Sequence, residues 1–172
     1  MTNKLDPKFL KLITDVPNYP KPGVTFKDIT PLLGSPHFPE LIQELADLVR
    51  DLEFDAIAGI ESRGFILGAA VAHETNVGFV PVRKKGKLPP PVFSQNYALE
   101  YGEDTVEVKA GKGRVVVIDD VLATGGTLKA SADVLAKAGY EVVGFAVLMN
   151  LTFLNQFTWI SIGADSLIEF SK

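Results

Sequence analysis

The stretch that most constrains the fold is Val115–Thr127, which reads VVVIDDVLATGGT. Its four leading β-branched residues are typical of a strand buried on both faces of a parallel sheet. Two carboxylates, Asp119 and Asp120, follow at the carboxyl end of this strand, and a helical pattern begins a few residues later. Ligands of open α/β sheets bind just beyond the carboxyl ends of the strands, so we expect a binding site here.

The turn after the acids has the residue types that bind a phosphate monoester, namely Ala123, Thr124, Gly125, Gly126 and Thr127. The two glycines let the backbone approach an anion closely, and the two threonines add hydroxyl donors. Free amides at the helix start add a partial positive charge. The carboxylates cannot bind that phosphate, but they accept hydrogen bonds from vicinal hydroxyls. The combination predicts a sugar phosphate, with both acids near the ribose 2′- and 3′-hydroxyls.

This order of strand, paired acids and Thr-Gly-Gly-Thr resembles the phosphoribosyl-pyrophosphate (PRPP) binding motif of the type I phosphoribosyltransferases. The alternative is an ordinary strand–turn–helix with a glycine-rich turn. A Walker loop is excluded, because the sequence contains no G-x-x-x-x-G-K-[ST].

A second strand, Ala56–Ile60, ends in Glu61-Ser62-Arg63-Gly64 before an apolar helix. The guanidinium of Arg63 is a rigid fork of donors suited to phosphate, although a helix cap with a solvated arginine would give the same pattern. The segment matches the family's I-[ED]-S-R-G-F loop. That resemblance implies a turn in which Ser62 and Arg63 bind pyrophosphate, with Arg63 also taking part in catalysis. It further implies a cis peptide between Glu61 and Ser62.

A third strand, Gly78–Val82, runs into a basic segment with four cations in five residues, Arg83–Lys87. Such a run is usually a solvated or nucleic-acid-facing patch. Its place at a strand end in an acidic chain favours pyrophosphate instead. The segment matches the family's R-K-x-G-K-L-P, which implies that Lys84 and Lys87 bind pyrophosphate. It also implies that Arg83 contributes to pyrophosphate binding from a dimer interface beside that site.

The segment Val16–Gly23 is too rich in proline for regular structure, and Pro31 is expected to end the segment that follows. Beside the PRPP motif, residues 16–35 resemble the base-covering hood of the adenine phosphoribosyltransferases. That resemblance implies main-chain contacts from Thr25 and Lys27 to adenine, with Phe26 near the ring. Thr25 departs from the family's usual apolar residue.

Residues 93–108 alternate in polarity around Gly102, which predicts two short antiparallel strands. A plain hairpin is one interpretation, and a lid is another, because long loops on α/β scaffolds often close over sites. The Leu-Glu-Tyr-Gly quartet matches the flexible catalytic loop of the adenine enzymes. It implies that Glu100 is a proton donor near N7 of the purine and that Tyr101 lies near the reacting sugar.

Helices are predicted at Phe38–Leu52 and Leu128–Ala138, and a further buried strand at Val142–Met149. The stretch Val142–Ala164 lacks charged residues and is long enough to span a bilayer. Several polar residues interrupt it, so a buried strand is the better interpretation.

Length and composition set further limits. A chain of 172 residues suits one domain with a sizeable core. The net charge of −4 argues against binding along a nucleic-acid backbone, and the absence of cysteine excludes disulfides, zinc–thiolate sites and thiol nucleophiles. No signal peptide is visible at the N-terminus, so we expect a cytoplasmic protein that does not enter a membrane.

The matched segments occur in the family's order from about Pro20 to Phe170. The resemblance implies one α/β phosphoribosyltransferase domain over residues 1–172. Its fold would be a twisted, mainly parallel sheet with helices on both faces, plus a small N-terminal hood and a flexible hairpin.

The reaction so implied is adenine plus PRPP giving AMP and pyrophosphate in a homodimer. Mg²⁺ would be held mainly by the phosphates and water rather than by direct protein ligands. Two alternatives remain: a type I enzyme for another purine, and a non-enzymatic regulator that senses PRPP.

Overall fold

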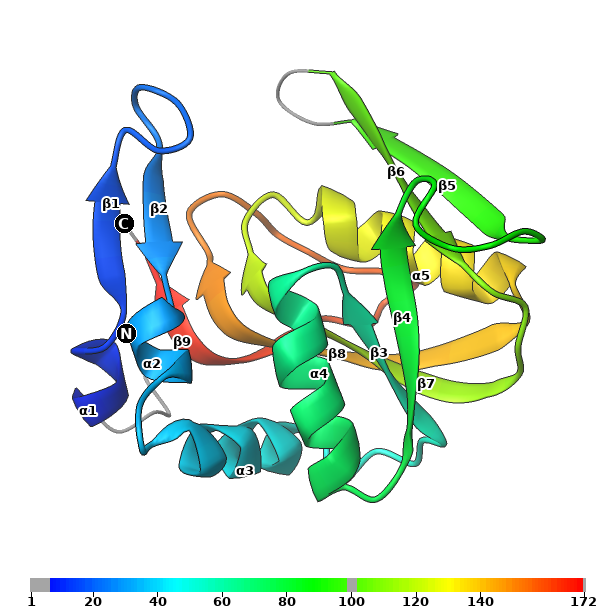
Figure 1. The fold of residues 1–172 in the computed structure, drawn as a ribbon, viewed down its shortest axis with the longest axis horizontal. Coiled ribbons are helices and arrows are strands. Elements are labelled where there is room, and N and C mark those ends of the chain that lie inside the picture. The colour runs from blue at the N-terminus through cyan, green and yellow to red at the C-terminus, as the bar shows by residue number, and fades with distance from the viewer. Residues whose placement is uncertain (1–6, 99–101, 172) are drawn as a thin grey trace.

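A seven-stranded sheet forms the centre of the molecule (Figure 1). The computed structural model describes residues 7–98 and 102–171. The strand order is β5-β6-β4-β3-β7-β8-β9, and the five strands from β4 to β9 in that order run parallel. Their bounds are β3 Ala56–Ile60, β4 Gly78–Lys84, β7 Gly113–Leu122, β8 Tyr140–Leu151 and β9 Asp165–Phe170. The predicted mainly parallel α/β sheet is confirmed.

Helices cover both faces of this sheet, and strand residues alternate between them. On one face, Val116 and Ile118 pack with α3 (Phe38–Leu48) and α4 (Arg63–Glu74). On the other face, Val115 and Val117 pack with α5, which spans Gly126–Lys137. This period of two, with apolar residues on both sides, is what a doubly covered parallel strand requires.

The hairpin predicted at residues 93–108 is present, and it belongs to the main sheet. Its strands, β5 (Phe93–Ala98) and β6 (Glu103–Val108), are antiparallel, and β6 pairs in turn with the end of β4. Residues 99–101 lie outside the described residues, and with them the predicted roles of Glu100 and Tyr101.

The N-terminal hood is more regular than the sequence suggests. Strands β1 (Thr14–Pro17) and β2 (Thr25–Asp28) form an antiparallel pair, flanked by α1 (Pro7–Leu10) and α2 (Thr30–Leu33). The expectation of irregular structure from Val16 is therefore wrong at its start, where the chain pairs with β2. Pro31 does not end the segment but lies in the first turn of α2, where its fixed φ suits a helix start.

Two further differences concern element ends. Helix α3 ends at Leu48, four residues before the predicted end, and Leu52 instead donates its amide to the carbonyl of Val49 at 3.0 Å. The C-terminal tail adds β9, an edge strand that the sequence analysis did not assign. Beside it stands the hood, where the Nζ of Lys27 lies 4.3 Å from the ring centroid of Phe170 (Figure 1).

A strained turn joins Trp159 to Ile162, whose backbones exchange two hydrogen bonds of 2.9 and 2.8 Å. Both central residues have left-handed backbones, with φ of 46° at Ile160 and 68° at Ser161. A β-branched residue rarely adopts this conformation, and here the side chain is 77% exposed, so packing does not compensate for the strain.

We therefore expect Ile160→Asn to raise the free energy of unfolding by about 1 kcal/mol, because asparagine tolerates this backbone region. Chemical denaturation measures the change. Ile160→Val is the matched control, since valine keeps the branched Cβ and should give no gain. Equal stability of the asparagine and valine variants would contradict the prediction.

Candidate active site

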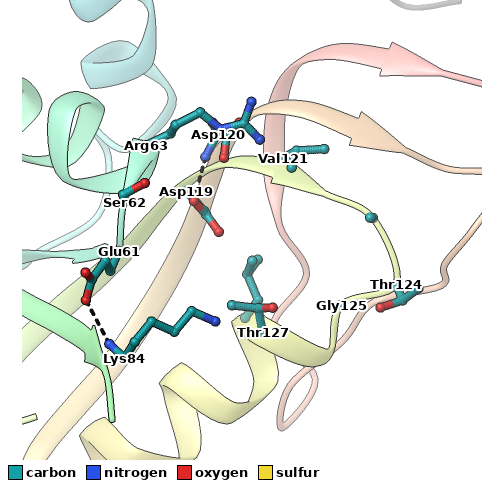
Figure 2. A pocket seen from close by; sticks show the side chains of 12 residues that line it. Glu61, Ser62, Arg63, Lys84, Asp119, Asp120, Val121, Thr124, Gly125 and Thr127 are labelled. Carbon is teal, nitrogen blue, oxygen red and sulfur yellow. Dashed lines mark hydrogen bonds and ion pairs between the residues drawn. The ribbon is translucent and has the colours of Figure 1, made fainter. Parts of the chain in front are cut away.

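A cavity of about 330 Å³ opens at the carboxyl ends of the central strands, where the helices α4 and α5 begin (Figure 2). Nine of the residues singled out in the sequence line it, and they come from three separate segments. These are Ser62, Arg63, Lys84, Asp119, Asp120, Ala123, Thr124, Gly125 and Thr127. Glu61, Val121 and Leu128 complete the wall. The parallel topology thus brings together what the sequence separates by more than sixty positions.

The turn Ala123–Thr127, which we call the phosphate turn after its predicted ligand, leads from β7 into α5. Gly125 is the N-cap of α5 with φ of 88°, a conformation that glycine adopts without strain. The first amides of the helix have no partner within it and face the loop, so this end of α5 is suited to an anion. Gly126 does not line the cavity. A Cβ at that position would lie 3.6 Å from the carbonyl oxygen of Ala98, which places Gly126 against the hairpin.

The two acids point to opposite faces of β7, as consecutive strand residues do. Asp120 is 3% exposed, and its carboxylate lies 2.8 Å from Nη2 of Arg63. Asp119 accepts a hydrogen bond of 2.9 Å from the amide of Asp120. Burial raises the pKa of Asp119 well above its usual value, and the charge of Asp120 raises that pKa further. Burial also raises the pKa of Asp120, although the guanidinium of Arg63 offsets part of this effect.

Arg63 connects the acids to the hood. Its Nη1 donates to the carbonyl oxygen of Lys27 at 3.2 Å, and its guanidinium carbon lies 4.5 Å from the ring centroid of Phe26. The same side chain therefore contacts β2 of the hood and Asp120 of β7. The residue predicted for pyrophosphate is also the physical link between the hood and the cavity.

The loop between β3 and α4 has the predicted cis peptide between Glu61 and Ser62. The loop motif assigns no binding role to the side chain of Glu61. In the structure, its carboxylate accepts a hydrogen bond from the amide of Lys84 at 2.9 Å and pairs with Arg83 at 3.3 Å. Burial would raise the pKa of Glu61, but these donors outweigh it and hold the pKa below its usual value. Glu61 thus fixes the start of the basic segment against the β3–α4 loop.

The basic segment divides into two parts. Lys84 lines the cavity, whereas Arg83 and Lys87 do not. Arg83 pairs with Glu61 and donates from Nη1 to the carbonyl oxygen of Lys87 at 3.1 Å. Lys85 and Lys87 are exposed. The assignment of Arg83 and Lys87 to pyrophosphate therefore stays a prediction that the cavity of one chain does not itself explain.

A second cavity of about 430 Å³ lies between the hood and the phosphate turn. Thr25, Phe26 and Lys27, the predicted adenine residues, all line it. The opposite wall is apolar and comes from Leu151, Phe153 and Leu154, which the sequence analysis did not assign to the site because no motif marks them. The two cavities share Arg63, Val121, Ala123 and Thr124, so they are adjacent.

Two other features of the described residues bear on the site. They contain no cluster of three or more His, Asp or Glu side chains that could hold a metal ion. Within the same residues, no helix is long and apolar enough to cross a bilayer. The uncharged stretch from Val142 instead begins with the buried strand β8.

Residues 35–152 match the family described as the phosphoribosyl transferase domain. Among curated relatives, the adenine phosphoribosyltransferase of Bdellovibrio bacteriovorus is 48% identical over 162 residues, which cover 92% of this chain and 97% of that protein.

Solved structures of adenine phosphoribosyltransferases are also similar to this chain. The crystal structure of adenine phosphoribosyltransferase from Rhodothermus marinus has a TM-score of 0.86 at 43% identity and covers 95% of this chain and 97% of that one. That of the Trypanosoma brucei enzyme, solved in complex with AMP, pyrophosphate and ribose-5-phosphate, has a TM-score of 0.83 at 29% identity, with 95% of this chain and 78% of that chain covered.

The raised pKa of Asp119 has a consequence for stability. The unfolded carboxyl ionises near its ordinary pKa of about 4, whereas the folded one stays protonated to higher pH. The folded state therefore binds more protons over that interval, and stability falls as the pH rises through it. We expect Asp119→Asn to unfold at higher temperature than the wild type at neutral pH, with a gain of about 1 kcal/mol.

This gain should shrink as the pH falls towards about 4, where the wild-type carboxyl is neutral in both states. Denaturation of both proteins across this pH range measures it. Asp165→Asn, which removes an exposed carboxylate, is the control and should show no such pH-dependent gain. A loss of stability in Asp119→Asn at neutral pH would contradict the prediction.

Proposed function

Because the chain belongs to the phosphoribosyl transferase family, and within it to the adenine phosphoribosyltransferases, we propose that the two adjacent cavities carry out the reaction of that family. The enzyme transfers the 5-phosphoribosyl group from PRPP to adenine and gives AMP and pyrophosphate, a step of purine salvage. One observation in the structure carries this assignment. An apolar cavity large enough for a base shares a wall with a polar cavity that contains a helix start suited to an anion.

We place the phosphoribosyl group in the polar cavity in the orientation that the sequence motif predicts. Its 5′-phosphate would lie on the turn from Ala123 to Thr127, and its ribose hydroxyls would donate to Asp119 and Asp120. C1 of the ribose would then face the shared wall, next to the base cavity. This orientation brings the reacting carbon to the nitrogen that attacks it.

The chemical step needs charge stabilisation rather than a protein nucleophile. Breaking the C1–O bond leaves positive charge on the ribose and negative charge on the departing pyrophosphate. Ser62, Arg63 and Lys84 line the cavity where that anion would form, and their donors stabilise it. The acids cannot act as a glycosidase pair, because adjacent strand residues do not flank one bond from two faces.

Mg²⁺ fits this site as a partner of the phosphates. Glu61 is already occupied by Arg83 and the Lys84 amide, and Asp120 by Arg63. Mg²⁺ retains water and binds readily to phosphate oxygens, so it needs few protein ligands. We propose that pyrophosphate oxygens and water hold it, and that it neutralises charge on the leaving group when bound.

Two predicted catalytic residues, Glu100 and Tyr101, enter the proposal through the family resemblance alone. The strands on either side lead the chain from Ala98 to Gly102, and Ala98 lies against Gly126 of the phosphate turn.

We expect adenine to be preferred over hypoxanthine and guanine by at least about a hundredfold in kcat/KM. Main-chain groups of the hood at Thr25 and Lys27 have a fixed pattern of donors and acceptors, and a 6-oxo purine would mispair with it. The measurement is pyrophosphate release from Mg²⁺-PRPP with each base in parallel. Comparable rates with a 6-oxo purine would favour the alternative of another purine substrate, and no release with any base would favour a PRPP-sensing regulator.

We also propose a homodimer that uses the outer face of α4 and the basic segment. Ile66 on this face is 47% exposed, and the guanidinium of Arg83 lies 5.8 Å from the ring centroid of the neighbouring Phe65. Arg83 and Lys87 lie outside their own cavity, so a partner copy would give their charges an anion to bind. Two-fold symmetry is the commonest arrangement of such assemblies.

Ile66→Asp should therefore convert the dimer into monomers and lower the activity, because it places a charge in the proposed interface. Light scattering after size exclusion gives the mass. Ile160→Asp is the control, since Ile160 is exposed but lies in the Trp159–Ile162 turn, where Trp159 packs with the α5 face of the sheet and not with α4. An unchanged mass for the Ile66 variant would exclude this face as the interface.

A further inference from the structure

The ammonium of Lys84 is bound by two side chains of the β5–β6 hairpin. Its Nζ donates to the hydroxyl oxygen of Tyr97 at 2.5 Å and also bonds to the carboxylate of Asp104. The Tyr97 hydroxyl in turn donates to the same carboxylate at 3.2 Å. Tyr97 and Asp104 lie directly opposite each other on β5 and β6, one pair before the end of the hairpin ladder.

The direction of these contacts matters. Lys84 lines the 330 Å³ cavity, whereas neither Tyr97 nor Asp104 does. The side chain of Lys84 extends into the cavity towards Thr127 (Figure 2). A lysine ammonium has three N–H donors. Two of them are taken by the hairpin, which leaves the third for an anion that approaches from the cavity side.

The electrostatics of the cluster are consistent with this arrangement. Partial burial of Lys84 would lower its pKa, but the contacts with Asp104 and Tyr97 outweigh burial and hold the pKa above its usual value. The same contacts hold the pKa of Asp104 below its usual range, although burial acts the other way. Lys84 therefore stays charged in a half-buried position, on a stem that would otherwise sample many rotamers.

We propose that Asp104 and Tyr97 are positioning residues that orient the ammonium of Lys84 towards the leaving pyrophosphate. This inference rests on the proposed function and adds to it two hairpin residues that touch neither cavity. It also gives the hairpin a second role. The same lysine that lines the pyrophosphate subsite also holds the ends of β5 and β6 near Ala98 and Glu103, so this end of the hairpin and that subsite are coupled.

The test is a double-mutant cycle on the binding of Mg²⁺-pyrophosphate, measured by calorimetry on the full chain. Asp104→Asn should weaken pyrophosphate binding about fivefold to tenfold, because the ammonium loses its charged anchor. In a Lys84→Met background, the same change should have less than about a twofold effect, since the group on which it acts is gone. Binding of AMP, which would occupy the phosphate turn and the base cavity, should stay within about twofold of the wild type in Asp104→Asn.

Two further variants separate positioning from general damage. Glu103→Gln removes the neighbouring exposed carboxylate of the same strand and should bind pyrophosphate as the wild type does. Tyr97→Phe keeps the buried ring, removes the second acceptor, and should weaken pyrophosphate in the same direction by a smaller factor. It keeps the test decisive if Asp104→Asn does not fold.

The outcomes are distinct. Equal pyrophosphate affinity in the wild type, Asp104→Asn and Tyr97→Phe would overturn the positioning role while leaving the proposed function intact. An equal loss of AMP and pyrophosphate binding, or an undiminished effect of Asp104→Asn without Lys84, would show that the carboxylate is merely structural and would also overturn it. A wild-type protein that binds neither AMP nor pyrophosphate would overturn the proposed function, and this inference with it.

Discussion

Arg63 and Asp120 form the ion pair on which the arrangement of the site depends. Asp120 lies at the end of the central strand β7, and Arg63 begins α4, so their contact of 2.8 Å fixes that helix start against the strand end. The same guanidinium reaches Phe26 and the Lys27 carbonyl in the hood. A buried carboxylate without this partner would carry a large desolvation penalty, so the sheet, the helix and the hood are positioned together.

Close packing makes this junction possible. Gly64 follows Arg63, and a Cβ there would lie 2.9 Å from both the Asp119 carboxylate and the carbonyl oxygen of Ile118. No real Cβ tolerates such contacts, so only glycine allows α4 to begin this close to β7. Three consecutive residues thus have three different roles. Ser62 presents an exposed hydroxyl, Arg63 extends its guanidinium to Asp120, and Gly64 lets the backbone of α4 pack directly against β7.

The sequence predicted the parts of the fold that local patterns encode. The run Val115–Ile118 and the segment Ala56–Ile60 are continuous apolar strands, and both are strands of the sheet. The hood was less predictable, because its pairing of Val16 with Phe26 depends on contacts between segments rather than on local propensity. Proline usually indicates a turn or the end of an element, yet Pro17 lies in strand β1 and Pro31 in the first turn of α2.

The site shows the same division. Motifs marked nearly all the residues that line the phosphate cavity, since each lies in a short stretch with its own chemical signature. They did not reveal the partners of those residues. Glu61 contacts the end of β4 more than twenty positions away, and Phe153 and Leu154 form part of the wall of the second cavity without any local pattern. Such contacts exist only after the sheet has placed β4 beside β3 and β8 beside β7.

Three basic side chains of the site form ion pairs with carboxylates of the protein itself. Arg63 pairs with Asp120, Arg83 with Glu61, and Lys84 with Asp104. In a chain of net charge −4, this pairing keeps cations charged and ordered at positions that are partly removed from water. It also weakens the net field of those cations at the cavity. In the proposed function, the attraction for the phosphates would then come in larger part from the free amides at the start of α5 and from the Mg²⁺ proposed to accompany them. A site of this kind would bind a polyanion through the direction of its donors as much as through net charge.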